Sequence, residues 1–133
     1  MLRYVECHRD SWQGLPKFIP TKEKVRYLQT LLNAGFLHLD MGSFVSAKAV
    51  PQLADTEEVL AHLRPPEHAD LLCIIANERG LERALTAPNI TSVGYPLSVN
   101  DTFQRRNTNC NLEDSWPLVE NLLKNKGGLA PVV

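Results

Sequence analysis

The chain has 133 residues, the size of one ordinary domain, and its 44% hydrophobic and 22% charged residues are typical of a soluble globular protein. The formal net charge of −1 gives no overall attraction to nucleic acid or to an anionic membrane, so we expect neither as a partner. No apolar run approaches the roughly 20 residues that span a bilayer. Arg3 and Glu6 interrupt the apolar stretch that an N-terminal signal peptide would need.

The cysteines bear on the cellular compartment. Cys7, Cys73 and Cys110 are widely spaced, odd in number and in no CxxC pair. This pattern predicts neither a disulfide framework nor a structural zinc site. We therefore expect a reducing compartment, the cytoplasm or the mitochondrial matrix.

The first part of the chain predicts two strands with a helix between them. Residues 2–5 are apolar apart from Arg3 and predict a strand. Thr21 is suited to an N-cap, apolar side chains follow at helical spacing, and Gly35 is a stop signal, so a helix is expected between them. Residues 36–40 predict a second strand, and residues 42–43 have the composition of a turn.

A second helix and a buried strand come next. Asp55 and Glu58 form a D-x-x-E variant of the capping box, which predicts that a helix begins there, and Pro65 ends it. Residues 71–75 are a continuous apolar run. Such a run is typical of a strand that is covered on both faces.

The last third of the chain predicts a short helix at about residues 79–85 and a weaker strand at residues 90–95. Residues 98–111 are polar and predict a loop, and a final helix follows up to residue 126. We expect residues 1–126 to form the domain and residues 127–133 to form a flexible tail.

Four strand–helix units in succession predict an α/β fold with a parallel sheet. Two architectures fit this order: a small doubly wound sheet, or part of a (β/α)8 TIM barrel. A complete barrel needs about 250 residues, so this chain could supply only a partial barrel of about four β/α units.

Polar side chains gather at the carboxyl end of each predicted strand, which is where parallel α/β sheets bind their ligands. Loops are polar in any protein, however, and Arg9 beside Asp10 can be a surface pair worth under ~1 kcal/mol, so spacing alone leaves both interpretations open. The four histidines form no HxH or HxxxH pair, which favours packing or solvent exposure over metal binding. The polar candidates, strand by strand, are Glu6, Arg9, Asp10 and Gln13; Asp40, Ser43, Ser46 and Lys48; Asn77, Glu78 and Arg79; Tyr95, Ser98 and Asn100.

Three segments resemble the 3-hydroxy-3-methylglutaryl-CoA lyase family of metal-dependent, aldolase-type TIM barrels, in the family's order. VECHRDSWQGL is similar to the family's VEVGPRDGLQ segment, and RRNTNCNLEDSW is similar to KKNINCSIEESF. GSFVSAKAVPQLADTEEVL resembles the SFVSPKWVPQ segment and the helix after it. The RD-x-x-Q string is shared widely among such barrels, whereas SFVS-x-K-x-VPQ is narrower and indicates the lyase branch.

The resemblance implies roles for four residues near the first two strands. Asp10 would be a ligand of Mg²⁺ or Mn²⁺, ions that prefer hard oxygen donors. Arg9 would hold the enolate oxygen that develops when the substrate's carbon–carbon bond breaks. Gln13 would orient the acyl group or a water, and Asp40, where the family has glutamate, would help to position protons or a metal-bound water. We expect Arg9, Asp10 and Asp40 to share one cavity, with their charges facing the metal.

The same resemblance implies an acyl-CoA substrate and residues to bind it. Ser43 and Ser46 would line the acyl pocket. Lys48 and Asn107, the latter within the 105–107 stretch, would meet the CoA. Trp12 stands where the family has leucine, which leaves the acyl specificity open.

Much of the family's catalytic equipment has no counterpart in this sequence. The family takes two metal ligands from an HxH motif on a later strand, and a catalytic cysteine from a Gly-Gly-Cys loop. One carboxylate holds a divalent cation weakly in water, if at all. We therefore expect this chain to be inactive as a lyase on its own.

Three functions follow as hypotheses. The first is a lyase that cleaves a 3-hydroxyacyl-CoA to acetyl-CoA and a keto acid, incomplete as this chain. The second is a non-catalytic half-barrel that acts by association, either as a homo-oligomer or with a complementary half-barrel, because its edge strands would be open. The third is a synthase of the same superfamily that runs the condensation direction.

Overall fold

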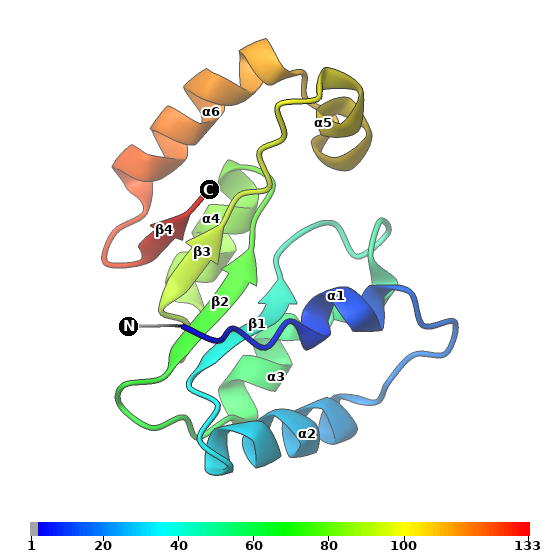
Figure 1. Cartoon of the computed structure of the whole chain (residues 1–133), viewed down its shortest axis with the longest axis vertical. Helices are drawn as coiled ribbons and strands as arrows, with labels where there is room; N and C mark the ends of the chain where they lie inside the picture. Colours follow the sequence, from blue (N-terminus) through cyan, green and yellow to red (C-terminus); the bar gives the residue numbers. More distant parts are fainter. Residues whose placement is uncertain (1–2) are drawn as a thin grey trace.

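The computed structural model describes residues 3–133 and contains a four-stranded sheet with helices between the strands (Figure 1). All three strand pairings are parallel, and the strand order β1-β2-β3-β4 follows the sequence. The fold class predicted from the sequence, α/β with a parallel sheet, is confirmed. The elements are α1 (His8–Gln13), α2 (Thr21–Asn33), β1 (His38–Ser43), the 3₁₀ helix η1 (Pro51–Leu53), α3 (Thr56–His62), β2 (Asp70–Ile74), α4 (Glu78–Thr86), β3 (Ser92–Gly94), α5 (Asp101–Thr108), α6 (Leu112–Asn125) and β4 (Ala130–Val132).

The two faces of the sheet differ in their burial. On the helix-covered face, the neighbouring residues Leu39 and Leu71 are fully buried, and so is Cys73 further along β2. The alternate residues of β2, Leu72 and Ile74, are only half-buried. In Figure 1, α3 and α4 lie behind the sheet. The core therefore sits between the sheet and its helices, while the other face is less covered.

The predicted strand at residues 2–5 is reduced to one pairing. Residues 1–2 lie outside the described part of the chain, and residues 3–5 have no strand assignment. Only Glu6 pairs in parallel with Leu39: its N–H donates to the His38 carbonyl at 3.0 Å, and its carbonyl accepts from the Asp40 N–H at 2.9 Å. The pairing stops there because α1 begins at His8.

Residues 42–43 do not form the turn that their composition predicts, because both belong to β1. Gly42 is needed for packing instead. A Cβ atom at this position would lie 2.6 Å from the Thr56 side chain at the start of α3. The glycine thus allows α3 to approach the strand closely.

The N-cap predicted at Thr21 is wrong, and at Asp55 the predicted helix start is confirmed but the capping box is not. Pro20 is the N-cap of α2, and Asp55, although at the N-cap of α3, makes no side-chain capping bond. The Asp55 carboxylate instead accepts hydrogen bonds from Lys24 Nζ at 2.6 Å and from Thr21 Oγ1 at 2.8 Å. Lys24 is almost completely buried, and it also donates to the Gln52 carbonyl. A buried ion pair between α2 and the start of α3 takes the place of the capping box.

The segment expected to be a loop at residues 98–111 contains α5. Asn100 caps this helix by accepting from the Phe103 N–H at 3.0 Å. The buried Gln104 side chain accepts from the Ser98 N–H at 2.8 Å and donates to Ser115 Oγ, on α6, at 3.1 Å. The helix was not predicted because its buried contacts are hydrogen bonds of the Gln104 amide and not contacts of apolar side chains.

The expectation of a flexible tail at residues 127–133 does not hold for its last part. Ala130–Val132 forms β4, which pairs with β3. The Ala130 N–H donates to the Thr91 carbonyl and the Tyr95 N–H donates to the Val132 carbonyl, both at 2.9 Å. The backbone turns at Gly127, whose φ is +59°, so that α6 leads into β4, the fourth parallel strand of the sheet.

We predict that Lys24→Ala lowers the free energy of unfolding by about 3–5 kcal/mol, because it leaves the Asp55 carboxylate without its buried cation. Urea denaturation followed by circular dichroism measures this change. Arg26→Ala is the matched control: it breaks an exposed pair with Glu23 on the same helix and should cost less than about 1 kcal/mol. Equal effects of the two variants would contradict the structural importance of the buried pair.

Candidate active site

The centre of the candidate site is a paired contact between Arg9 and Asp40. Arg9 belongs to α1, and Asp40 lies in β1, 31 residues later. Nη2 of the guanidinium lies 2.6 Å from Asp40 Oδ2, and Nε lies 3.0 Å from Asp40 Oδ1. Their side chains are only 16% and 8% exposed. A two-pronged contact of this kind fixes the plane of the guanidinium as well as its position.

Asp10 and Gln13 extend this contact toward solvent. Arg9 Nη1 donates to Asp10 Oδ1 at 3.2 Å, and Gln13 Nε2 donates to the same oxygen at 3.3 Å. Asp10 is 71% exposed and contacts Arg9 rather than Asp40. The structure therefore brings together the four residues predicted near the first two strands, but the opposite charges face each other.

Charge and burial act in opposite directions on Arg9. Burial by itself would lower the pKa of the guanidinium, but the hydrogen bonds and charge of Asp40, followed by the charge of Asp10, raise that pKa overall. Burial, and then the charge of Asp40, raise the pKa of the neighbouring Cys7 thiol. Cys7 is thus not an activated thiolate near neutral pH, and its position beside the site does not make it a nucleophile.

The remaining predicted site residues do not join this network. Ser43 is buried in β1, where its hydroxyl donates to the Ile74 carbonyl at 3.2 Å. Ser46 and Lys48 are exposed in the segment after β1, and Ser46 Oγ accepts from the Lys48 N–H at 3.3 Å. Asn107 lies on α5, where its amide donates to the Phe103 carbonyl at 2.8 Å.

The residues of this chain do not fit a tightly held metal ion. Within residues 3–133, no three or more His, Cys, Asp or Glu side chains are grouped closely enough to hold one. Asp10 stands alone as an accessible carboxylate, and the cation beside it, Arg9, already neutralises part of its charge. A divalent ion here would gain one protein carboxylate and keep most of its water ligands, so it would be held weakly.

His8 supports the site in a way that the sequence did not reveal. It is 3% exposed, and its ring centroid lies 4.7 Å from that of Trp12 and 5.8 Å from that of Tyr27 on α2. This aromatic cluster packs α1 against α2. It therefore fixes the position of His8, which precedes Arg9 in α1. The four-residue spacing of His8 and Trp12 places both on one face of a helix, which is the signal that could have indicated it.

The buried His8 ring is also electrostatically unusual. Neither ring nitrogen has a hydrogen-bond partner among the described residues. Burial lowers the pKa of His8 to about 4; the nearby Met41 backbone acts in the opposite direction, and the charge of Arg9 adds to the lowering. The imidazole is therefore neutral in the folded protein at physiological pH.

Comparison with known proteins identifies the family, although no family model matches the chain. The 3-hydroxy-3-isohexenylglutaryl-CoA/hydroxymethylglutaryl-CoA lyase of Pseudomonas aeruginosa is 34% identical over 107 residues, 80% of this chain. The mitochondrial hydroxymethylglutaryl-CoA lyase of Mus musculus is 33% identical over 108 residues, 81% of this chain. The chain belongs to the hydroxymethylglutaryl-CoA lyase family. It spans only about a third of these relatives, 35% and 33% of their respective lengths.

Solved lyase structures agree with this assignment. An Acinetobacter baumannii HMG-CoA lyase, described in complex with coenzyme A and 3-methylmalate, superposes with a TM-score of 0.90 at 29% identity. The match covers 98% of this chain and 43% of that one. The P. aeruginosa lyase gives a TM-score of 0.81 at 32% identity, over 93% of this chain and 43% of the other. The predicted family and its barrel-type fold are thus confirmed for part of a lyase.

No helix within residues 3–133 is long and apolar enough to cross a membrane.

We predict that this lyase-family chain loses stability as the pH falls from about 6.5 to about 4. The unfolded state binds a proton at His8 in that range while the folded state does not, so the folded state loses up to about 3 kcal/mol relative to the unfolded state. His8→Phe keeps an aromatic ring and removes the titration. Urea denaturation at several pH values should show a shallower slope for His8→Phe, and identical slopes would contradict a buried neutral His8.

Proposed function

We propose that this chain serves the metal-dependent cleavage of a 3-hydroxyacyl-CoA to acetyl-CoA and a keto acid, as one part of a hydroxymethylglutaryl-CoA lyase-type site. The observation that carries the proposal is the network of Arg9, Asp10, Gln13 and Asp40, assembled from two separate segments. It occurs in a chain whose curated relatives are named as lyases of this type. A related structure described with bound coenzyme A supports an acyl-CoA as the substrate class.

Arg9 is the group that we assign to the developing enolate oxygen. Its Nε and Nη2 atoms are occupied by the buried Asp40, which orients the guanidinium from behind. Its Nη1 atom faces the exposed Asp10 and Gln13. This is the edge of the fork that a substrate oxygen would reach, and a guanidinium fixed in advance stabilises an oxyanion at little reorganisation cost.

Asp10 is the proposed ligand of Mg²⁺ or Mn²⁺, and Gln13 would orient the acyl group or a water beside it. Since a single carboxylate is a weak site, the other ligands would have to come from outside residues 3–133. Asp40 would act chiefly by positioning Arg9.

The substrate would extend from this network along the segment after β1. We assign Ser43 and Ser46 to the acyl side and Lys48 to the CoA side, together with Asn107 if the substrate reaches α5. Ser46 and Lys48 are exposed and free to be contacted, whereas the Ser43 hydroxyl is already bonded to backbone. A cytoplasmic or mitochondrial-matrix location agrees with the mitochondrial and cytoplasmic lyases among the relatives.

A second candidate function is association without catalysis. The described residues lack a cluster that could hold a metal, and residues 3–5 and 130–132, next to the outermost pairings of the sheet, are exposed. These two observations favour a half-barrel that acts with a partner, either a second copy or a complementary half-barrel.

We predict that the chain alone releases no acetoacetate from hydroxymethylglutaryl-CoA, because it lacks most of the metal ligands. Mixing it with the part of the P. aeruginosa lyase outside the matched segment, in the presence of Mg²⁺ or Mn²⁺, should restore release. Asp10→Asn should reduce that activity by about 100-fold, since it weakens the cation's carboxylate ligand.

Asp101→Asn is the matched control. It alters a carboxylate that pairs with Arg105 on α5, away from the Arg9 network, and should leave acetoacetate release unchanged. An Asp10→Asn mixture as active as the unaltered one would refute the proposed metal role. A complementation that fails with folded components would favour the association function.

A further inference from the structure

A buried glutamine joins two segments that belong to the candidate site. Gln52 lies in η1, directly after the segment that carries Ser46 and Lys48, and it is only 5% exposed. Its side-chain amide contacts residues 17–19, in the loop that leads from α1 to α2. This loop continues from the end of α1, the helix that carries Arg9.

Both ends of the Gln52 amide are used, and both bond to backbone. Oε1 accepts from the Ile19 N–H at 2.8 Å, and Nε2 donates to the Lys17 carbonyl at 3.0 Å. Since one partner is a donor and the other an acceptor, only one orientation of the amide satisfies both. The two bonds therefore fix the direction of the loop as well as its distance from η1.

Lys24 holds the same junction from α2. Its buried ammonium donates to the Gln52 carbonyl and to the Asp55 carboxylate, and it lies 4.2 Å from the centre of the Phe18 ring. Phe18 belongs to the loop, so the cation contacts both of the joined segments. Buried polar groups are costly unless each one is paired, so the loop and η1 are held in one arrangement.

The segment between β1 and η1 is bonded internally. The Ala49 and Val50 N–H groups donate to the Ser46 carbonyl at 2.9 and 3.0 Å. The Lys48 N–H donates to Ser46 Oγ at 3.3 Å. The Leu53 N–H donates to the Val50 carbonyl at 3.1 Å, so this turn runs on into η1. A side chain that fixes η1 therefore also fixes the turn with its exposed serine and lysine.

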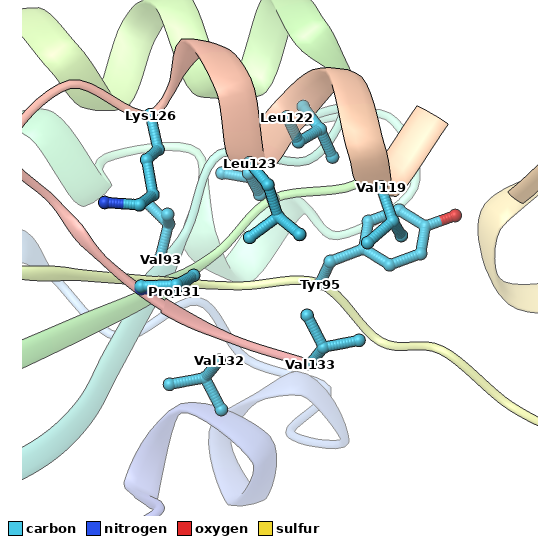
Figure 2. Close-up of a pocket in the computed structure, with 10 residues that line it drawn as sticks. Val93, Tyr95, Val119, Leu122, Leu123, Lys126, Pro131, Val132 and Val133 are labelled. Carbon is cyan, nitrogen blue, oxygen red and sulfur yellow. The ribbon is translucent and has the colours of Figure 1, made fainter. Parts of the chain in front are cut away.

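Apolar packing would not fix this junction in the same way. Figure 2 shows how α6 packs on the sheet through apolar side chains, among them Val119, Leu122 and Leu123. Hydrophobic contacts of this kind are not directional. The hydrogen bonds of Gln52 do have a direction, and they are made to backbone. Such an anchor suits a junction whose function depends on the orientation of the two segments that it joins.

We propose that Gln52 is a positioning residue of the lyase-type site, which holds residues 46–48 at a fixed place relative to Arg9. The consequence for substrate binding rests on the proposed function, in which Lys48 meets the CoA and Arg9 the enolate oxygen. Arg9 is oriented by Asp40 and does not depend on Gln52. Loss of the Gln52 bonds should therefore weaken the binding of acyl-CoA while the arginine stays in place.

Limited proteolysis with trypsin tests the link between the two segments without any assay of activity. Lys17 and Lys48 are exposed trypsin sites, one on each segment. Gln52→Met keeps the length of the side chain and removes both bonds, so initial cleavage after Lys17 and after Lys48 should rise together, by at least about fivefold. Cleavage after the exposed Lys124 on α6 should not change, and it reports any unfolding of the whole chain.

Gln29→Met is the matched control. The Gln29 amide makes the same pair of bonds to backbone, accepting from the Arg64 N–H at 2.9 Å and donating to the Arg64 carbonyl at 3.1 Å. It joins α2 to the segment that precedes β2, at the amino end of that strand. It should therefore leave cleavage after Lys17 and Lys48 unchanged. Circular dichroism verifies that both variants are folded.

Amide hydrogen exchange of the unaltered chain needs no variant and covers the case in which Gln52→Met does not fold. Relative to intrinsic rates, the Ile19 N–H should exchange at least about tenfold more slowly than the N–H groups of Lys17 and Phe18, which have no acceptor within residues 3–133. Equal protection of the three amides would overturn the proposal. So would a rise in cleavage after Lys17 without a rise after Lys48.

Kinetics in the complementation assay separate positioning from a merely structural role. Gln52→Met should raise the KM for hydroxymethylglutaryl-CoA at least about fivefold and change kcat less than about twofold, because a contact far from the reacting bond acts equally on ground state and transition state. A structural residue would lower the folded fraction, and with it the apparent kcat, at unchanged KM. Gln29→Met should leave KM unchanged.

The positioning role and the lyase function can fail separately. Active complementation with an unchanged KM for Gln52→Met would refute the positioning role and leave the lyase function standing. Failed complementation, together with linked cleavage after Lys17 and Lys48, would refute the lyase function and leave the link between the two segments standing.

Discussion

The contact between Arg9 and Asp40 is the constraint on which the candidate site depends. It joins the short helix α1 to the first strand of the sheet, and it is the link through which Asp10 and Gln13 are positioned. Two largely buried, opposite charges are costly to separate, since either one alone would remain desolvated. The aromatic packing of His8 against Trp12 and Tyr27 supports the same helix from its other side. The site is therefore built into the fold and does not depend on a bound ligand for its shape.

The Arg9–Asp40 contact forms without the metal ligands that the chemistry of the family would need. Arg9 pairs fully with Asp40 and in part with Asp10, so the excess negative charge of the three side chains lies on Asp10. Only Asp10 remains accessible enough to bind a cation. The described residues thus hold the guanidinium of Arg9 in a fixed orientation but include no cluster of ligands for a divalent ion.

Apolar periodicity predicted the parallel sheet and placed the polar strand ends at one edge. The resemblance to the lyase family singled out Arg9, Asp10, Gln13 and Asp40 among them. The sequence could not predict that the opposite charges would face each other, since that depends on how α1 packs on β1. The buried Lys24 was missed for a similar reason: a lysine on a helix is normally assigned to solvent, and only the tertiary position of Asp55 makes its burial tolerable. α5 was missed because its buried contacts are made by an amide, which leaves no apolar stripe.

The last strand, β4, is another element that the sequence pattern did not predict. Residues 130–132 form a strand of only three residues, and all three are exposed. A segment this short has no apolar pattern that distinguishes a strand from a frayed end. The conformation of these residues comes from the backbone of β3, which pairs them, and from α6, which packs behind them. Because proline has no N–H, Pro131 contributes a carbonyl but no donor to the side of β4 away from β3.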